Sequence, residues 1–492
     1  MKLSQLLDFD VTDEVKNLEI IDIADDSRKV VKGGMFVAIN GNASDGALYI
    51  EDAVKKGAAC VVINSDIAGK IFRESSGNNS IYNKDGVVFI VVENSRKFLA
   101  NVCARFWRSN FENVIAVTGT NGKSSTVDIV RQILNFANKP AASVGTLGII
   151  TEKYRKDNGG LTSPGAVALH QIFHQLNEEG IQNIAIEASS HGIDQHRIDA
   201  IPFSVCAFTN FTQDHLDYHH SFENYWNAKA GLFKDLATEN TTFVINSDDD
   251  ASFQKLVDIA NQKNVKLISY GKKSDDIKLL NYSHAGQHQN VEIEVRGVQY
   301  SFKLPLAGEF QIYNALCSLG ICLSAGLDAD FICESLEKLT PINGRLEYIA
   351  EKNGAHIYID YAHTPDALQK AIQSLRKHTK NRLIVVFGCG GNRDSDKRSL
   401  MGEVAAKYAD LTIVTDDNPR KENPAEIRKM ILRSCVGAVE IENRRNAIEY
   451  AIKQLQFGDV LLIAGKGHET YQILHDETIY FSDKETILEV LS

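Results

Sequence analysis

Residues 114–124, VIAVTGTNGKS, join a run of β-branched residues to a glycine-rich turn that ends in a lysine and a serine. Such a turn at the start of a helix offers backbone N–H groups to phosphate oxygens. Lys123 can reach the terminal phosphates, and the Ser124 hydroxyl can bind Mg²⁺. The full Walker spacing needs glycine where this chain has Val117, so the loop is a shortened variant. The segment predicts an ATP site.

Other polar residues follow neighbouring apolar runs. Glu187 ends the run IAIE, and its carboxylate can help to hold Mg²⁺ beside the phosphate loop, although a lone glutamate at a strand end is also a common cap or ion-pair partner. Further on, His215, His219 and His220 gather near Asp214. Zinc is the alternative there, but no cysteine accompanies the histidines and their spacing fits no standard zinc pattern.

Composition sets the broad class. A chain of 492 residues that is 43% hydrophobic can bury large cores and is expected to form about three domains. The net charge of −11 argues against a general nucleic-acid partner. No apolar run approaches the ~20 residues of a membrane span, and the N-terminus has no export signal, so we expect a cytoplasmic protein without a membrane partner. The eight cysteines lack CxxC spacing and indicate reduced core thiols.

The hydrophobic pattern predicts an α/β protein with three domains. In residues 1–95, a helix at EDAVKKG lies between strands MFVAI, CVVI and VVFIVV, and the polar stretch 73–86 has too few apolar residues for packed structure. Residues 96–340 begin with the helix SRKFLANVCARFW, and strands IAIE, VCAFT and FVIN then alternate with helices, which favours a parallel sheet.

The pattern changes twice more along the chain. Alternating runs between about 276 and 304 predict an antiparallel appendage to the central sheet. In residues 341–492, the strands HIYID, LIVVF, LTIVT and VLLIAG fit a doubly wound domain that binds ligands at the carboxyl ends of its strands.

Seven ordered segments resemble motifs of the Mur ligase family: TGTNGKSST, EASSHG, TNFTQDHLDYH with AKAGLF downstream, GRLE, DYAHTPDAL, FGCGGNRDSDKR and AGKGHE. The resemblance covers essentially the whole chain and is most specific for the ligases that extend UDP-N-acetylmuramoyl-L-alanyl-D-glutamate in cytoplasmic peptidoglycan synthesis, a process behind cell-wall formation, cell shape and division. It implies a uridine-nucleotide domain (1–95), an ATP-binding domain (96–340) and a Rossmann-like domain that brings the amino acid (341–492).

The resemblance also implies a reaction. ATP phosphorylates the D-glutamate carboxylate, and an amino acid then attacks the acyl phosphate, so alignment and charge neutralisation replace a protein nucleophile. Lys123 serves the phosphates, Ser124 and Glu187 hold one Mg²⁺, and His215 with a carbamylated Lys229 holds a second. A carbamate supplies the anionic oxygen that a hard cation prefers. Without the resemblance, Lys229 is typical of a lysine on a half-buried helix.

Further residues are assigned to each substrate by the resemblance. For ATP they are Gly119, Thr120, Asn121, Gly122, Lys123, Ser124, Ser125, Asn314, Arg345, Asp360 and His363. For the UDP-N-acetylmuramoyl-dipeptide they are Ser27, Asn42, Ala43, Ser44, Thr162, Ser163, Ser189, Gln195 and Arg197. For the amino acid they are Arg393, Asp417, Asn418, Pro419, Arg420, Gly465 and Glu469. The chain departs from the usual family residues at Ser125, Gln311 and Asn343, without losing a charged group.

Arg393 and Arg420, each in a loop after a C-terminal strand, predict the incoming amino acid. Two guanidiniums suit a second carboxylate, and the DNPR segment resembles that of ligases adding meso-2,6-diaminopimelate, whose distal ammonium Glu469 can take. L-Lysine is the alternative substrate. A folylpolyglutamate synthetase would share the phosphate loop but not the SSHG and GGNRD strings together, and a regulatory NTPase would explain only the phosphate loop. We expect a monomer.

Overall fold

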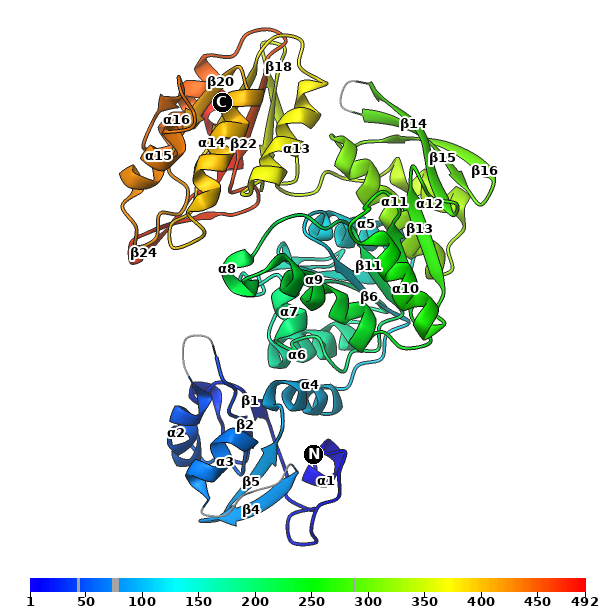
Figure 1. Cartoon of the computed structure of the whole chain (residues 1–492), viewed down its shortest axis with the longest axis vertical. Coiled ribbons are helices and arrows are strands. Elements are labelled where there is room, and N and C mark those ends of the chain that lie inside the picture. Colours follow the sequence, from blue (N-terminus) through cyan, green and yellow to red (C-terminus); the bar gives the residue numbers. More distant parts are fainter. Residues whose placement is uncertain (42–44, 73–78, 286–287) are drawn as a thin grey trace. The chain divides into compact units, whose positions relative to one another are not determined.

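The computed structural model describes residues 1–41, 45–72, 79–285 and 288–492 (Figure 1). No helix in these ranges is long and apolar enough to cross a membrane. The chain divides into two compact units, which are described in turn. The first contains residues 1–116, 139–204 and 227–241, and the second contains residues 117–138, 205–226 and 242–492.

The first unit opens with a small five-stranded sheet. Strands β1, β2, β3 and β5 are parallel and adjacent in that order, and β4 pairs antiparallel with β5. The elements are α1 (Leu3–Leu6), β1 (Ile23–Ala24), η1 (Ser27–Lys29), β2 (Met35–Val37), η2 (Gly46–Tyr49), α2 (Ile50–Lys55), β3 (Cys60–Asn64), α3 (Ser65–Ile71), β4 (Ser80–Lys84), β5 (Val87–Val92) and α4 (Ser95–Phe106).

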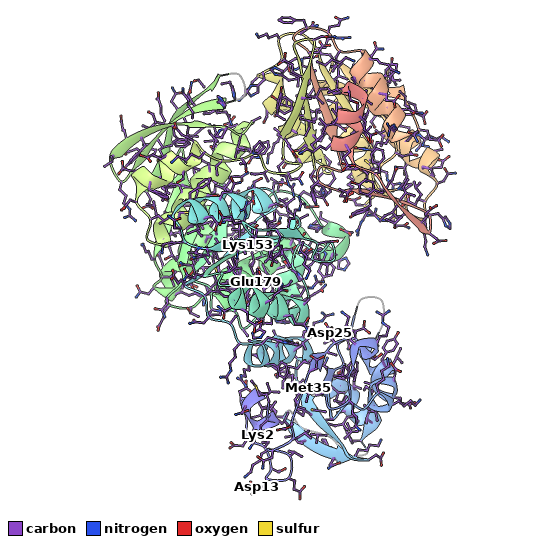
Figure 2. All side chains as sticks on the ribbon, turned by 180° about the vertical axis from the view of Figure 1, so that it is seen from behind. Lys2, Asp13, Asp25, Met35, Lys153 and Glu179 are labelled. Carbon is purple, nitrogen blue, oxygen red and sulfur yellow. The ribbon has the colours of Figure 1, made fainter. Side chains whose placement is uncertain are left out.

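Alternate residues of this sheet enter cores on its two faces, as the two-residue period of a strand requires. Met35, labelled in Figure 2, packs with Leu3 and Leu99 on the face covered by α1 and α4. Phe36 packs with Ile50 on the face covered by α2. The predicted helix after Asn94 and the strands of this region are confirmed.

Strand β4 corrects one prediction. Residues 80–84 lie inside the polar stretch that was predicted to lack packed structure, yet they pair along β5 from Ser80 opposite Val91 to Lys84 opposite Val87. Tyr82 also stacks on Phe72 with ring centroids 4.4 Å apart. An edge strand needs apolar residues on one face only, because its backbone hydrogen bonds to its neighbour do not depend on side-chain type.

The rest of the first unit holds a second group of strands in the order β10-β7-β8-β9, with β10 and β7 parallel. Its elements are β7 (Ala141–Gly145), β8 (Gly148–Ile150), β9 (Arg155–Lys156), α6 (Ala166–Glu178), β10 (Asn183–Glu187), α7 (Ser190–Asp194) and η3 (Leu232–Leu236). Two elements span the division between the units: β6 (Asn113–Thr118) and α9 (Phe222–Gly231). Glu187 is the last residue of β10, as predicted.

In the second unit, β11 to β14 are parallel neighbours and β14 to β16 form the predicted antiparallel appendage. The elements are α5 (Lys123–Phe136), β11 (Val205–Phe208), α8 (Leu216–His219), β12 (Thr242–Asn246), α10 (Phe253–Lys263), β13 (Leu267–Gly271), β14 (Ile277–Ala285), β15 (His288–Val295), β16 (Val298–Leu304), α11 (Glu309–Ser324) and α12 (Ala329–Leu336).

The C-terminal sheet has the order β17-β18-β22-β19-β20-β21, parallel except for β17. Helices α13 to α15 cover one face and α16 and α17 the other, so the doubly wound prediction is confirmed. The elements are β17 (Glu347–Lys352), β18 (Ala355–Asp360), α13 (Pro365–Arg376), β19 (Leu383–Phe387), α14 (Asp396–Tyr408), β20 (Leu411–Val414), α15 (Pro424–Leu432), β21 (Val439–Glu440), α16 (Arg444–Lys453), β22 (Val460–Ala464), β23 (Tyr471–Leu474), β24 (Glu477–Tyr480) and α17 (Asp483–Leu491).

A buried ion pair joins α16 to α17. The Arg444 guanidinium donates to both carboxylate oxygens of Asp483 at 2.7 Å and to the Ala464 carbonyl at 2.9 Å, and both charged side chains are fully buried. Since removing one partner leaves an uncompensated buried charge, we predict that Asp483→Asn lowers the free energy of unfolding by about 3–5 kcal/mol in urea titrations. Glu489→Gln, which breaks the exposed pair of Arg445 with Glu489 between the same helices, is the control and should change little. Equal effects would contradict the role of burial.

Candidate functional site

The phosphate loop predicted from the sequence connects β6 to α5. Gly119 has φ +137° and Gly122, at the helix N-cap, has φ +90°. A Cβ on Gly119 would lie 2.0 Å from Thr209 Oγ1, and one on Gly122 would lie 2.4 Å from Asn314 Oδ1. Both positions therefore require glycine for space as well as for conformation. Lys123 Nζ donates to the carbonyls of Gly119 and Thr120 at 2.8 Å each.

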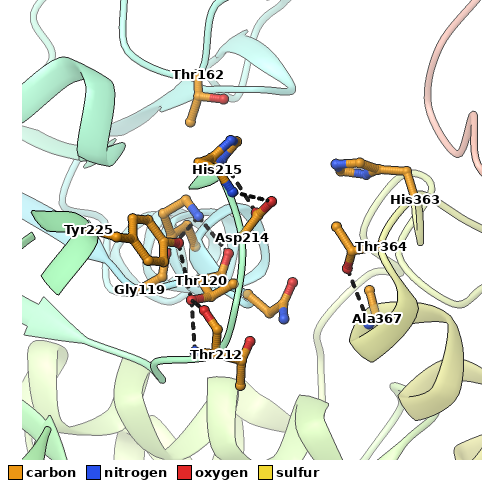
Figure 3. A network of polar contacts seen from close by, with 12 residues as sticks. Gly119, Thr120, Thr162, Thr212, Asp214, His215, Tyr225, His363, Thr364 and Ala367 are labelled. Atoms are coloured by element: carbon orange, nitrogen blue, oxygen red, sulfur yellow. Dashed lines mark hydrogen bonds and ion pairs between the residues drawn. The ribbon is translucent and has the colours of Figure 1, made fainter. Parts of the chain in front are cut away.

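The loop after β11 holds this turn from the side. Asn210 Oδ1 accepts from the Asn121 N–H at 3.0 Å, and Thr209 Oγ1 donates to the Asn121 carbonyl at 2.6 Å. Thr120 Oγ1 donates to the Thr212 carbonyl and accepts from the Thr212 N–H, and the Tyr225 hydroxyl lies 3.2 Å from Thr120 Oγ1 (Figure 3). These bonds fix the turn before any ligand binds.

Asp214 and His215 lie beside the turn in the same loop. Asp214 accepts the His215 N–H at 2.9 Å, and His215 Nε2 lies 3.4 Å from its other oxygen. Burial raises the pKa of Asp214, but the positive charges of His215, His363 and Lys123 outweigh it, and the net pKa is below the ordinary value. In Figure 3 the imidazole of His363 extends from its loop toward the side on which His215 and Asp214 lie.

A cavity of about 940 Å³ opens against the turn, and its lining contains most residues predicted to bind ATP. Those in the lining are Asn121, Gly122, Ser124, Ser125, Asn314, Arg345, Asp360 and His363. A cavity of this size with converging polar groups suits a nucleotide.

Two of the family departures bear on this cavity. Gln311 accepts from Asn314 Nδ2 at 2.9 Å and donates to the Arg345 carbonyl at 3.3 Å, so it orients both neighbours. Arg345 in turn donates from Nη2 to the Ser124 hydroxyl at 2.9 Å and lies 4.7 Å from the ring centroid of Tyr361. Ser125 is buried on α5 behind the turn. A positive guanidinium thus stands at the phosphate loop.

Sequence reasoning missed Tyr313 and Asp248 in the cavity lining and Asp366 beside the phosphate loop. Asp366, at the start of α13, accepts from Asn121 Nδ2 and from Lys370 Nζ at 2.9 Å each. In the cavity lining, Tyr313 donates to Asp248 at 2.8 Å. Asp248 follows strand FVIN in the string SDDD, and that polar cluster after a strand was the available signal. Asp366 lies in the motif DYAHTPDAL, but nothing in that segment points to its partner Asn121, which is 245 residues away.

In the first unit, Glu187 is buried and held by Thr146, whose N–H donates at 2.6 Å and whose hydroxyl lies at 3.3 Å. Thr146 also lies 3.0 Å from the Thr162 hydroxyl, and Ser163 donates to the Glu187 carbonyl at 2.8 Å. Several residues predicted to bind the sugar nucleotide therefore surround the end of β10.

Lys229 lies near the end of α9 with only 1% of its surface exposed. Ser124 and His215 belong to the second unit, and Glu187 and Lys229 to the first. In the described ranges, no group of three or more His, Cys, Asp or Glu side chains forms a metal cluster. The donor set predicted for Mg²⁺, a buried carboxylate and a buried hydroxyl, nevertheless has the hard oxygen chemistry that this ion prefers.

A second cavity of about 410 Å³ lies in the first unit and is lined by Gln195 and Arg197, both predicted sugar-nucleotide residues. Ser189 caps α7 through the Gly192 N–H at 3.0 Å. Ser27 is buried in η1, where its carbonyl accepts from Lys56. The predicted residues Asn42, Ala43 and Ser44 lie outside the described residues.

The loops after β19 and β20 meet in the C-terminal sheet. Gly391 donates to the Asn418 carbonyl at 2.9 Å, and Arg420 Nη1 donates to the Gly391 carbonyl at 3.0 Å. A Cβ on Gly390 would lie 2.8 Å from Arg420 Nη1 and 4.0 Å from Arg393 Cγ. The structure therefore brings both predicted arginines to one side of the same glycine.

Glu469 is held by a buried lysine that sequence reasoning did not assign. Lys466 Nζ, fully buried, lies 3.3 Å from Glu469 Oε2 and 3.1 Å from Asn418 Oδ1. Asn418 Nδ2 also donates to Glu469 at 2.9 Å. Burial raises the pKa of Glu469, against the opposing charge of Lys466. Gly465 has φ +112° beside Asp417, where a Cβ would lie 2.7 Å from Asp417 Oδ2.

Models of the three parts of one family match successive ranges of the chain: "Mur ligase family, catalytic domain" at 19–107, "Mur ligase middle domain" at 117–322 and "Mur ligase, glutamate ligase domain" at 344–467. The chain belongs to the Mur ligase family, with the N-terminal, central and C-terminal domains of that fold.

Among individual proteins, the chain is similar to a relative from Bradyrhizobium diazoefficiens named UDP-N-acetylmuramoyl-L-alanyl-D-glutamate--2,6-diaminopimelate ligase. The two are 43% identical over 500 residues, which cover 100% of this chain and 99% of the relative. A solved structure of a ligase with that name is 27% identical, with a TM-score of 0.71 over 100% of this chain and 98% of that one. A folylpolyglutamate synthase of Mycobacterium tuberculosis, 19% identical with a TM-score of 0.63 over 75% of this chain and 91% of its own, shares the fold alone.

Asp360 yields a prediction about pH. Its carboxylate accepts the N–H groups of Leu346 at 2.6 Å and Ala362 at 2.7 Å, and burial raises its pKa to about 6 despite the charge of Arg345. Because the folded state holds this proton more tightly than the unfolded chain, the stabilisation is complete below pH ~4 and is lost as the pH rises to about 6, a change of ~3 kcal/mol.

Urea unfolding of the wild type and Asp360→Asn between pH 4 and 7.5 measures this contribution as the difference between the two. Asp459→Asn is the control, because hydrogen bonds to its carboxylate, first from Arg382, outweigh burial and lower the pKa of Asp459, so its contribution should stay nearly constant over this pH range. Stability that rises with pH in the Asp360 comparison would contradict the assignment.

Proposed function

We infer that this chain is an ATP-dependent ligase that adds meso-2,6-diaminopimelate to UDP-N-acetylmuramoyl-L-alanyl-D-glutamate in peptidoglycan precursor synthesis. Likeness to ligases of that name over the full chain supports the reaction. The structural observation that carries it is the presence, in one unit, of a cavity at the phosphate loop and of two loops that present Arg393 and Arg420 together.

The reaction has two steps. The D-glutamate carboxylate attacks the γ-phosphorus of ATP, which releases ADP and leaves an acyl phosphate. The unprotonated amine of the amino acid then attacks the acyl carbon, and phosphate departs with the former carboxylate oxygen as the amide forms and the amine loses a proton. Lys123, Arg345 and the backbone N–H groups of the turn neutralise the phosphates, which is the main contribution a protein can make to such a transfer.

We propose that Ser124 and Glu187 hold one Mg²⁺ and that His215 with carbamylated Lys229 holds a second. Bound there, the ions would offset phosphate charge. The proposed ATP contacts are the eleven residues from Gly119 to His363 given above, with Asn314 on the base side, and Ser27, the 42–44 segment, Thr162, Ser163, Ser189, Gln195 and Arg197 are proposed to bind the sugar nucleotide. We also propose the domain limits 1–95, 96–340 and 341–492, a cytoplasmic monomer, and no nucleic-acid or membrane partner.

The carbamate at Lys229 has a direct test. A buried lysine is costly as an ammonium, and carbamylation converts it to an anionic oxygen donor. With ¹³C-bicarbonate, the protein should give a carbamate NMR signal that Lys229→Ala lacks. That variant should lose on the order of 10²-fold or more in kcat and recover part of it with added short carboxylic acids, by analogy with the loss of other charge-stabilising groups. Lys234→Ala, at an exposed position, is the control. Full activity of Lys229→Ala would refute the proposal.

Amino-acid choice follows from the two guanidiniums. Diaminopimelate has a second carboxylate for Arg393 and Arg420, whereas L-lysine leaves these two charges without a carboxylate, at a cost of about 2–5 kcal/mol, or roughly 30- to several-thousand-fold in kcat/KM. We assign Asp417, Asn418, Pro419, Gly465 and Glu469 to the same site, with Glu469 taking the distal ammonium. Lys466 already contacts Glu469, so the ammonium would share that carboxylate.

The selectivity prediction is tested with a panel of amino acids and the UDP-dipeptide. Arg420→Ala should raise the KM for diaminopimelate far more than the KM for ATP, while Arg433→Ala, an exposed arginine at the end of α15, should leave both unchanged. Equal kcat/KM for lysine and diaminopimelate in the wild type would refute the selectivity but not the ligase reaction. Turnover with glutamate on a folate substrate would favour the folylpolyglutamate alternative.

A further inference from the structure

The turn after α7 carries a histidine with no role in the function proposed above. Gln195 and Arg197 line the 410 Å³ cavity, and His196 lies between them in the same lining. Its backbone has φ +54°, a left-handed conformation that residues other than glycine seldom adopt. Contacts elsewhere must therefore hold the turn in this shape.

The imidazole of His196 is bonded on both sides. Nδ1 lies 2.9 Å from Asp199 Oδ2, and Nε2 lies 3.1 Å from Asn94 Nδ2. Asn94 Oδ1 already accepts the N–H groups of Arg96 and Lys97 at the start of α4, so its amide nitrogen must face the ring. Nε2 is therefore the acceptor and Nδ1 carries the proton, which it donates to Asp199.

The same turn positions Gln195 and Arg197, the two cavity residues on either side of His196. Arg197 donates to Gln195 Oε1 from Nη2 at 2.7 Å and from Nε at 3.2 Å, and its Nη1 donates to the Ser163 carbonyl at 2.8 Å. The backbone also closes here, since the Arg197 N–H donates to the Gly192 carbonyl at 2.8 Å. A change in the His196 conformation thus moves Gln195 and Arg197 together.

We propose that His196 is a positioning residue for the UDP-sugar substrate, held in its neutral Nδ1–H form between Asp199 and Asn94 so that Gln195 and Arg197 meet the substrate in a fixed geometry. The inference rests on the proposed function, under which Gln195 and Arg197 bind that substrate. The bond to Asn94 ties this turn to the N-cap of α4, and Arg96 and Asp25 are the other charged groups of the cavity lining.

The kinetic test uses His196→Asn in the full-length chain. Asparagine tolerates a left-handed backbone, so strain is not introduced, but its side chain is too short to reach Asn94. We expect the KM for the UDP-dipeptide to rise about tenfold, as for the loss of one hydrogen bond, with kcat and the KM for ATP within about twofold. His475→Asn is the matched control: His475 has φ +55° and an aspartate on Nδ1, but its side chain is 74% exposed.

The spectroscopic test is the ¹⁵N NMR signature of His196, assigned by its loss in His196→Asn. The wild type should show the neutral Nδ1–H tautomer at pH 7.5. In Asn94→Asp, the new carboxylate still caps α4 but presents an oxygen to Nε2, so both ring nitrogens should be protonated and the KM should stay within about threefold of the wild type.

The outcomes distinguish the positioning role of His196 from the proposed function of the chain. A wild type that does not turn over the UDP-dipeptide overturns the proposed function, and with it the substrate named here. An active wild type whose His196→Asn variant keeps its KM, or whose His196 carries its proton on Nε2, overturns the positioning role alone.

Discussion

The lack of space beside the turn between β6 and α5 is the constraint on which the site depends. Gly119 and Gly122 sit so close to Thr209 and Asn314 that no side chain fits, and both have φ values that favour glycine. That closeness lets the loop after β11 and the first turns of α11 touch the phosphate loop directly. The same helix also positions Arg345. Gln311, three residues before Asn314 on α11, donates a hydrogen bond to the Arg345 carbonyl and accepts one from Asn314. Backbone proximity at two glycines thus sets the positions of the charged groups.

Charge burial governs the C-terminal loops in a similar way. Lys466, with no exposed surface, is compensated by Glu469 and by the Asn418 amide, and this links the loop after β22 to the loop after β20. Arg420 has φ +52° and its N–H donates to the Ile473 carbonyl of β23. Several polar groups therefore orient each other before a substrate arrives, which reduces the entropy that binding must overcome.

The sequence was most informative where one residue type has one local meaning. The valine and isoleucine runs of β3, β5, β19 and β22 predicted strands because such residues pack well on a pleated, buried surface. The glycine-rich turn and the position of Glu187 at the end of a strand were also predicted from local residue types. Strand β4 was not predicted, because an edge strand is stabilised by backbone pairing that its polar residues do not reveal.

Contacts between distant segments were beyond such reasoning. Nothing near Asp366 points to Asn121, and nothing near Asn94 points to His196, 102 residues away. Strands β17 and β21 and the β23–β24 hairpin were missed because each depends on a neighbour for its ladder. The role proposed for Lys229 rests only on resemblance to a family, since burial on a helix does not by itself distinguish a ligand from a structural lysine.

The proposed reaction depends on the activation of a substrate carboxylate by ATP. The most direct measurement uses UDP-N-acetylmuramoyl-L-alanyl-D-glutamate with ¹⁸O in the reacting D-glutamate carboxylate, and follows the label by mass spectrometry of the phosphate released with diaminopimelate and ATP. We predict one ¹⁸O atom in the released phosphate for each amide bond formed, with one ADP released for each. Amide formation with unlabelled phosphate, or ADP release at the same rate without either substrate, would contradict it.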